Sequence, residues 1–547
     1  MVSFDNADQA TLSGVWGRLA GRDWGFIATS GFVLACLTMG GGAAVGFLSD
    51  VVIQLLAIPV LLVSLWRYLD VPAAERPPWA LTLAALIVAL PALQLVPLPP
   101  SVWTSLPGRQ PLVDSFTFLD RELPWAPISV APTGTWLSLM ALLPSLAVFF
   151  ATLLMSFRQR RQLSLVILAF GAGSVFLGLT QVAEGPSSPL RFFANTNPSE
   201  AVGFFANRNH FAALLYVMIL LAAAWASDAA MPTGDAPGQR RFEVATVLPM
   251  LGCFTLLVVF VAGEVMTRSR AGLGLTMVAL LGTFLLAYSD RRAVSGMTPA
   301  KLLLGLAVLT AIFLVQLGLY RVLERFGQDP LADDRIPFAR NTMDAALGFF
   351  PIGSGLGTFV TVYGAFEKTN DLLPNTFANH THNDALELWL ETGLAGAVIA
   401  ALCAVWIIRQ TVRVWRAGNW EARGVDLLLA RAASLAIGLL IAHSLFDYPL
   451  RTSAMMMLLA FCCALLTTPA RHVHTDDDGV RESGARRQEP VVRPVPAIAD
   501  AGSARRPSLS GERWGRGIEW PDAWRKPGGA PNATRRGRSG SDEGRGE

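Results

Sequence analysis

The sequence carries little charge for its length. Charged residues make up 16% of its 547 residues, whereas a soluble domain of ordinary composition contains about 25%. Hydrophobic residues make up 52%, the mean hydropathy is +0.43 and the formal net charge is +3. This composition excludes a cytosolic enzyme, a secreted disulfide scaffold and a wholly disordered chain, and it indicates a membrane protein.

Cysteine is also scarce, and all of it lies inside apolar runs, at Cys36, Cys253, Cys403, Cys462 and Cys463. Such positions favour neither a disulfide framework nor a zinc site. The sequence has no P-loop, no G-x-S-x-G elbow and no H-E-x-x-H motif. An Asp-x-Asp pair occurs only near the C-terminus, at Asp476 and Asp478. We therefore expect no metal ion, no other cofactor and no metal-dependent site for a nucleotide sugar.

Long apolar segments are abundant instead. At about 20 residues per span, they predict an all-α, polytopic membrane protein with about twelve transmembrane helices. The predicted helices are 25–42, 48–66, 78–97, 135–156, 163–183, 210–227, 244–264, 271–288, 302–319, 393–410, 425–445 and 452–469.

The links between these helices alternate in character. One set is short and basic, as at 158–161 and 409–423, and the positive-inside rule places it in the cytoplasm together with both termini. The other set contains the long connections, at about 98–134, 184–209 and 320–392. We expect the chemistry of the protein in these outward-facing links, above all in the large loop 320–392.

The C-terminal segment 471–547 is rich in Arg, Gly, Pro, Ser and Asp and poor in aliphatic residues. It cannot bury enough apolar surface to offset its ordering entropy. The expected organisation is therefore a cytoplasmic N-terminus (1–24), a transmembrane domain (25–470) and a disordered, basic cytoplasmic tail (471–547). A solvated tail without a specific partner is the simpler interpretation, and attraction to anionic lipid is the alternative.

Two outward segments concentrate polar residues beside the membrane. Before the helix predicted at 210–227, one turn contains Asn207, Arg208, Asn209 and His210. These residues could bind a ligand, or they could cap the helix and extend to the interface. The link 267–270 carries arginines against the charge bias of its side, and a guanidinium suits a phosphate or diphosphate; contact with a lipid headgroup is the alternative.

The large loop ends with His380 and His382, just before an amphipathic helix that presents Glu387 and Glu391 on one face. A histidine at the outer surface is a natural general base for a hydroxyl acceptor. Either glutamate could orient that histidine. A capping or interfacial pair of histidines is the alternative, and a metal pair is less favoured because no third ligand is evident.

Two further features belong to this side. The glycine-rich stretch 353–357 follows no predicted strand, so it predicts a tight turn that brings the backbone close to a helix or a ligand. A smaller polar cluster lies at the outer end of the helix predicted at 425–445 and consists of His443, Phe446, Asp447, Tyr448 and Arg451. Arg431, within that helix, is costly in lipid and should face the bundle interior, where a structural pair with an acid is the favoured interpretation.

Together these motifs resemble the bacterial O-antigen ligase and polymerase superfamily. The resemblance is carried by Phe-Ala-Asn-Arg-Asn-His-Phe at 205–211, Ser-Arg-Ala-Gly at 269–272, Asp-Arg at 334–335, Pro-x-Gly-x-Gly-Leu-Gly-Thr-Phe at 351–359 and His-x-His-Asn-Asp-x-Leu-Glu at 380–387. It covers roughly the helices from 163–183 to 425–445, and the tail lies outside it.

The resemblance implies a GT-C-like, inverting, metal-independent glycosyltransferase of the bacterial inner membrane. Its donor would be a glycan on undecaprenyl diphosphate at the periplasmic face. The catalytic histidine of the family matches His382 best, with His380 next. Its diphosphate-binding arginines match Arg270 and Arg335, with Arg340 as a rival for the second. The other expected site residues are Arg208, as a further binding group, and Asn207, Asn209, Asn383 and Glu391, as supporting groups.

The acceptor stays open at this point. It could be the lipid A core, as for a ligase, a growing lipid-linked glycan, as for a polymerase, or a protein hydroxyl, as for an O-oligosaccharyltransferase. A flippase or transporter for a lipid-linked glycan also suits twelve spans, but it would place polar residues along the helices rather than in the links. A membrane scaffold would leave the His and Arg motifs unexplained. No nucleic-acid partner is expected.

Overall fold

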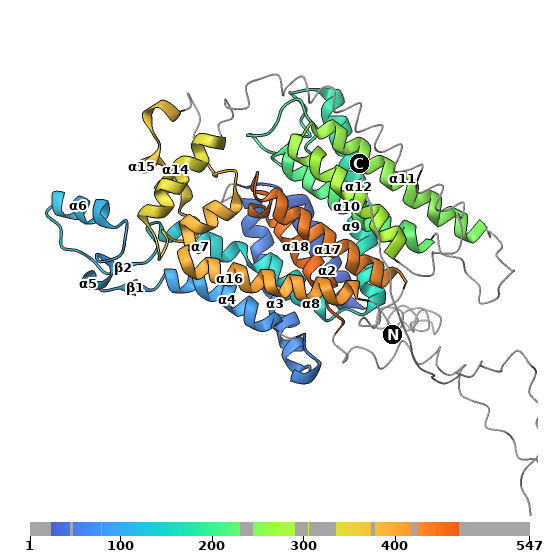
Figure 1. Ribbon diagram of the computed structural model, residues 1–547, viewed down its shortest axis with the longest axis horizontal. Coiled ribbons are helices and arrows are strands. Elements are labelled where there is room, and N and C mark those ends of the chain that lie inside the picture. The colour runs from blue at the N-terminus through green and yellow to red at the C-terminus, as the bar shows by residue number, and fades with distance from the viewer. Residues whose placement is uncertain are drawn as a thin grey trace, which may run out of the picture. The chain divides into compact units, whose positions relative to one another are not determined.

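The computed structural model describes residues 23–43, 48–77, 79–229, 244–289, 305, 335–372, 378–416 and 424–469. Within these ranges the chain forms a bundle of apolar α-helices (Figure 1). Apart from residue 305, the helix predicted at 302–319 lies outside the described residues. So does the tail 471–547, and the prediction of a disordered tail stays a prediction.

Eight helical segments in the described ranges are long and apolar enough to cross a membrane, which confirms a polytopic helical membrane protein. They are α3 (Leu48–Asp70), α7 with α8 (Pro132–Ala141 and Leu143–Leu153), α9 (Phe157–Glu184), α10 (Arg208–Ala229), α11 (Val244–Thr267), α12 (Arg270–Ser289), α16 (Asp384–Trp415) and α17 (Val425–His443). Three predicted spans are shorter apolar helices: α2 (Trp24–Met39), α4 (Ala80–Gln94) and α18 (Ser453–Leu465). The total of twelve stays a prediction.

Helix α10 lies at the centre of the bundle. It contacts α9, α11, α12, α17 and α18, and nearly all of its residues from His210 to Ser227 are buried. From Phe211 to Ala226 its sequence is apolar on every face, as in a buried helix or a membrane span, and its burial shows that other helices surround it. The start of α10 is therefore held in place from several directions.

The long links fold into small structures beside the bundle. Link 95–131 contains the strand pair β1 (Pro97–Leu98) and β2 (Ala126–Pro127) with α5 (Pro100–Trp103) and α6 (Gln110–Phe118). In the large loop, α14 (Arg335–Gly348), α15 (Phe359–Phe366) and the 3₁₀ turn η4 (Thr369–Asp371) precede α16. An apolar core joins α14, α15 and the first part of α16, and it includes Phe338, Phe349, Phe359, Tyr363 and Leu390. Two further 3₁₀ turns are η1 (Ala73–Glu75) and η5 (Pro449–Arg451).

Helix α16 breaks at Gly393, whose φ of 54° lies in the region that favours glycine. The break lets the glycine-rich turn pack against the helix. Ser354 N–H donates to the Leu390 carbonyl at 3.0 Å, and Leu394 N–H donates to the Pro351 carbonyl at 2.9 Å. The predicted tight turn with close backbone approach is thereby confirmed.

The links predicted to share one side do meet. Backbone hydrogen bonds join Ala206 to Gly41, Ala201 to Met266, Val130 to Ser354, Asp384 to Ser444 and Ala454 to Gly40. Which side of the membrane this is stays a prediction, because it depends on the charge bias alone.

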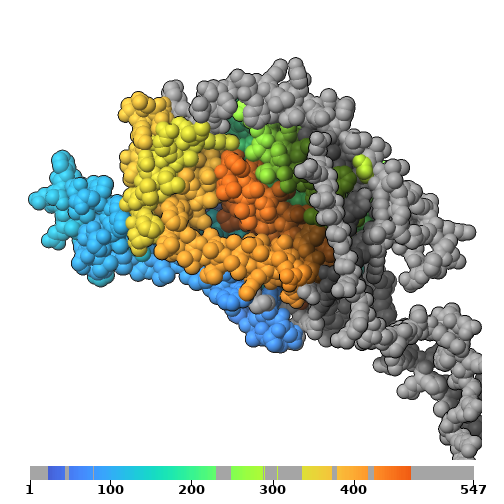
Figure 2. All heavy atoms as spheres, viewed as in Figure 1, coloured from blue at the N-terminus to red at the C-terminus, as the bar shows by residue number. Residues whose placement is uncertain are grey.

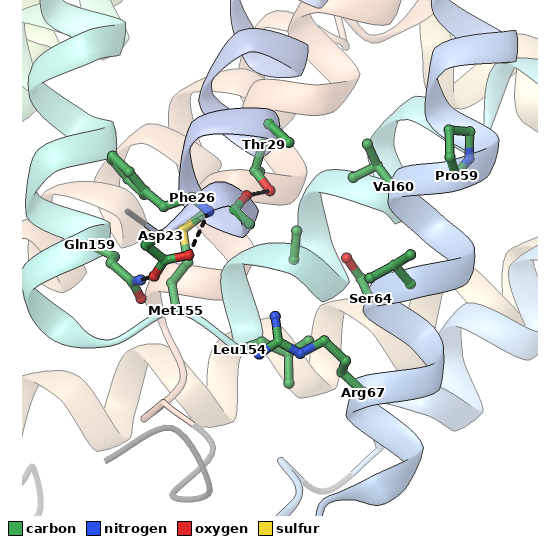
Figure 3. A pocket seen from close by; sticks show the side chains of 14 residues that line it. Asp23, Phe26, Thr29, Pro59, Val60, Ser64, Arg67, Leu154, Met155 and Gln159 are labelled. Carbon is green, nitrogen blue, oxygen red and sulfur yellow. Dashed lines mark hydrogen bonds between the residues drawn. The ribbon is translucent and has the colours of Figure 1, made fainter. Parts of the chain in front are cut away.

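The start of α2 lies at the other end of that helix from Gly40. There Asp23 caps α2 by accepting from Phe26 N–H, and it also accepts from Gln159 (Figure 3). A cavity of about 340 Å³ beside this cap is lined mainly by α2, α3 and the residues around Leu154. The two ends of the bundle thus differ: one carries a cap and a cavity, and the other carries the linked loops that hold the motif residues.

Replacing Gly393 with alanine should destabilise the protein. An alanine Cβ would lie 2.2 Å from the Pro351 carbonyl oxygen, and the positive φ alone costs on the order of 1–3 kcal/mol. We expect a lower thermal unfolding midpoint in detergent. Gly438→Ala is the matched control, since a Cβ there meets nothing within 4 Å. Equal midpoints for the two variants would contradict this account of the break.

Candidate active site

The turn before α16 fixes the backbone of His382. Asn383 caps the helix, because its side chain accepts from Leu386 N–H at 3.0 Å. His382 itself has a φ of 55°, which is uncommon for a residue other than glycine and is kept only where neighbouring contacts enforce it. The contacts of this turn therefore fix the backbone position from which the ring of His382 projects.

His382 pairs with a buried carboxylate. Its Nδ1 lies 3.2 Å from Oδ1 of Asp447, whose side chain has no exposed surface. Asn209 donates to the other carboxylate oxygen, and the Tyr448 N–H donates to Oδ1 at 2.9 Å. Because a carboxylate can only accept, Nδ1 of His382 carries a proton, and in the neutral ring the lone pair is on Nε2. Nε2 makes no hydrogen bond to any residue that the structure describes.

Asp447 is held in its ionised form. Burial raises the pKa of Asp447, but the hydrogen bond from His382 and the charges of the nearby histidines lower it by more. The pKa therefore lies well below the usual range of an aspartate. An ionised Asp447 can stabilise positive charge on His382 when that ring takes up a proton.

His380 has a different environment from His382. Its Nδ1 lies 2.8 Å from Oε1 of Glu387, and its Nε2 lies 3.1 Å from the Ala43 carbonyl oxygen. Both neighbours are acceptors, so both ring nitrogens must donate and the ring is an imidazolium. Burial lowers the pKa of His380, but the charge and hydrogen bond of Glu387 outweigh it and raise the pKa. A protonated His380 cannot act as a base.

The Tyr448 ring packs between the histidines. Its centroid lies 4.5 Å from that of His380, 4.8 Å from that of His382 and 5.0 Å from that of His210. Burial, helped by the charge of Asp447, raises the pKa of Tyr448 to about 12, so it is a neutral phenol at physiological pH. Its neutral ring thus lies against both His380 and His382.

Three of the predicted arginines each begin a helix. Arg208 is the first residue of α10, Arg270 of α12 and Arg335 of α14. Asn209 connects these starts, because it accepts from the Ser269 hydroxyl at 2.7 Å and donates to Asp447. Arg335 Nη2 lies 3.8 Å from the second oxygen of Asp447. Helix N-termini carry partial positive charge, and these starts, with that of α16, lie around the Asp447–His382 pair.

Three further predicted site residues, Arg208, Asn207 and Arg340, make local contacts or lie apart from Asp447. Arg208 forms an ion pair with Glu200 at 2.7 Å, and Asn207 caps α10 by accepting from Asn209 N–H at 2.8 Å. Arg340 is exposed and lies about 140° around α14 from Arg335. The two arginines therefore face different directions, and it is Arg335 that lies near Asp447.

The glutamates do not orient His382. Glu387 pairs with His380, and Glu391 accepts from the N–H groups of Gly357 and Phe359 at 2.9 and 3.3 Å. Of the two glutamates that could orient a histidine, Glu387 does contact His380, whereas the partner of His382 is Asp447. The sequence placed Asp447 in a polar cluster at the outer end of a predicted helix, but its local pattern did not predict a pair with His382.

Arg431 does face the bundle interior, as expected. It donates to the Ser289 hydroxyl at 2.8 Å and lies over the Trp415 ring. The surface is hollowed between the gold residues of α16 and the orange residues of α17 and α18 (Figure 2). In the part of the chain that the structure describes, no three His, Cys, Asp or Glu side chains are grouped as metal ligands.

The protonated state of His380 predicts a dependence of stability on pH. A pKa that is higher in the folded than in the unfolded protein adds stability below the unfolded pKa, and this stability is lost as pH rises through the folded pKa. We expect the unfolding midpoint of the wild type to fall as pH rises above about 6.5, and His380→Gln to remove that part of the fall. Superimposable pH profiles of the two proteins would show that His380 is not the group responsible.

Comparison with known proteins places the motif-bearing part of the chain in a family. No curated protein matches the chain. The family model for O-antigen ligase matches residues 251–401, a range that contains Arg270, Arg335, His380 and His382 but neither Asn209 nor Asp447. The resemblance seen in the motifs is thereby confirmed: the chain carries an O-antigen ligase family domain at residues 251–401.

Proposed function

We propose that the protein catalyses inverting glycosyl transfer at the periplasmic face of the inner membrane. The donor is a glycan on undecaprenyl diphosphate, and the acceptor is a hydroxyl of the lipid A core or of a growing glycan. The O-antigen ligase domain supports glycan ligation or polymerisation as the class of reaction. The periplasmic location is supported by the basic character of the opposite links.

One observation carries the proposal. A histidine with an unused Nε2 and a buried carboxylate partner lies where α10, α12, α14 and α16 begin, and three of these helices begin with arginine. A base for a hydroxyl and a surface for a diphosphate therefore lie next to each other. This combination suits a substrate whose leaving group is an anion and whose nucleophile is an alcohol.

The reaction can be written on these residues. Nε2 of His382 takes the proton of the acceptor hydroxyl as its oxygen forms a bond to the anomeric carbon. The bond from that carbon to the phosphate oxygen breaks on the opposite face, and its electron pair leaves with the lipid diphosphate. Attack from the face opposite the leaving group inverts the anomeric centre. The proton then departs from His382 to solvent.

Two electrostatic effects lower the barrier in this scheme. Asp447 stabilises the imidazolium that forms on His382, as the aspartate of a serine-protease triad does for its histidine. Arg270 and Arg335, with the helix N-termini, stabilise the charge that develops on the diphosphate. A diphosphate is already a good leaving group, so the scheme requires no strong general acid. This fits a site in which the carboxylates nearest His382 and His380 are engaged with those histidines.

The decisive test follows release of lipid diphosphate from purified protein supplied with undecaprenyl-diphosphate-linked glycan and one acceptor at a time. We expect release that depends on a glycan acceptor, and His382→Ala should lower kcat by about 100- to 10,000-fold, the usual contribution of a general base. The identity of the productive acceptor separates ligase, polymerase and protein glycosylation. Full turnover by His382→Ala would refute the base assignment, and lipid movement across vesicles without transfer would favour a flippase.

A second comparison separates the two loop arginines. Arg335→Ala should lower kcat/KM by about tenfold to a hundredfold, since hydrogen bonds to charged groups contribute roughly 1.5–3 kcal/mol. Arg340→Ala, on a different face of the same helix, is the matched control and should stay close to wild type. The reverse order of effects in the release assay would assign the diphosphate to Arg340.

A further inference from the structure

The guanidinium of Arg451 forms ion pairs with three carboxylates. It belongs to the short turn η5 between α17 and α18, and only 17% of its side chain is exposed. Its guanidinium nitrogens lie 3.4 Å from Asp384, 3.4 Å from Glu387 and 3.0 Å from Glu391. These acids occupy successive turns on one face at the start of α16. One arginine therefore holds the first two turns of that helix.

The contacts continue from these acids to the histidine turn. One oxygen of the Glu387 carboxylate accepts a hydrogen bond from Nδ1 of His380. Its second oxygen accepts from the N–H of Thr381 at 3.0 Å. Arg451 thus fixes Glu387, and Glu387 fixes the two residues immediately before His382.

The same turn also holds the partner of His382. Asp447 and Arg451 are four residues apart, in a short segment that is tied to α16 a second time. Asp384 N–H donates to the Ser444 carbonyl at 2.8 Å, and the Ser444 hydroxyl donates to the Asp384 carboxylate at 2.8 Å. The segment 444–451 therefore places Asp447 beside His382 and also binds the start of α16, the helix that follows His382.

We propose that Arg451 is a positioning residue that sets the geometry between His382 and Asp447 through Glu387 and His380. The inference rests on the proposed glycosyl transfer and adds to it a residue that does not touch the reacting atoms. Groups that orient metal-ligating side chains change affinity or activity by about tenfold to a hundredfold when removed, and we expect an effect of similar size here. Without Arg451, three acids would lie together with one cation, His380, and the turn at 380–383 would lose its fixed position.

A purely structural role would affect stability without affecting the chemical step. Glu387 and Glu391 provide the comparison, because both are buried partners of Arg451 on the same face, but only Glu387 touches His380. Arg160 provides a second comparison. It is a buried arginine that donates to the carbonyls of Thr152 and Ala464. These bonds lie among α8, α9 and α18, and none of them involves the histidine turn.

The experiment measures kcat and donor KM per folded molecule for Arg451→Met, Arg451→Lys, Glu387→Gln, Glu391→Gln and Arg160→Met. We expect Arg451→Met to lose about tenfold to a hundredfold in kcat with little change in KM. Glu387→Gln should lose a similar factor, and the Arg451→Met/Glu387→Gln double variant should lose no more than either alone. Glu391→Gln should lose clearly less. Arg451→Lys should recover part of the rate because it keeps the charge, and it serves if the methionine variant fails to fold.

Each other result bears on a different claim. Arg160→Met should lower the unfolding midpoint and leave kcat unchanged. If Arg451→Met and Arg451→Lys also lower the unfolding midpoint and leave kcat unchanged, as expected for Arg160→Met, then Arg451 is structural only and the inference fails. The proposed function would still stand if the wild-type activity depends on His382. Equal losses in Glu387→Gln and Glu391→Gln would also overturn it. Absence of transfer by the wild type with every acceptor would reject the proposed function itself.

Discussion

The site depends on the burial of one negative charge. The Asp447 carboxylate has no exposed surface, and a buried charge is stable only where surrounding groups donate to it. Its donors come from parts of the chain that are far apart: His382 before α16, Asn209 in α10 and the backbone N–H of Tyr448, with Arg335 of α14 close by. Satisfying this charge brings the starts of three helices together and aligns the histidine that carries the proposed chemistry.

Two histidines separated by a single residue acquire opposite roles from their neighbours. His380 lies between a carboxylate and a carbonyl oxygen, so both of its nitrogens donate and it stays charged. His382 meets one carboxylate and keeps Nε2 available. The Tyr448 ring lies against both and keeps them apart. The difference between the proposed base and its charged neighbour is therefore a property of the surroundings, since the two side chains are chemically identical.

The apolar bundle and the polar site divide the work of the fold. Because α10 is buried on all sides, the position of Asn209 in its first turn is fixed. The glycine-rich turn and the break at Gly393 let the backbone of the large loop contact α16. The matched family range contains Arg270, Arg335, His380 and His382, but it begins after the motif at 205–211 and ends before Asp447. Residues before and after the matched domain in the sequence thus complete the site: Asn209 precedes it and the segment 444–451 follows it.

Hydropathy was enough to predict a polytopic helical membrane protein, and the motifs were enough to single out Arg270, Arg335, His380 and His382 and to suggest the family. Helix periodicity also placed Glu387 and Glu391 on one face, where both contact Arg451. Local patterns could not pair His382 with Asp447, separate the roles of the two histidines or choose between Arg335 and Arg340. Those outcomes depend on side-chain contacts between segments many residues apart, and the packing of the helices decides which polar groups share a buried space.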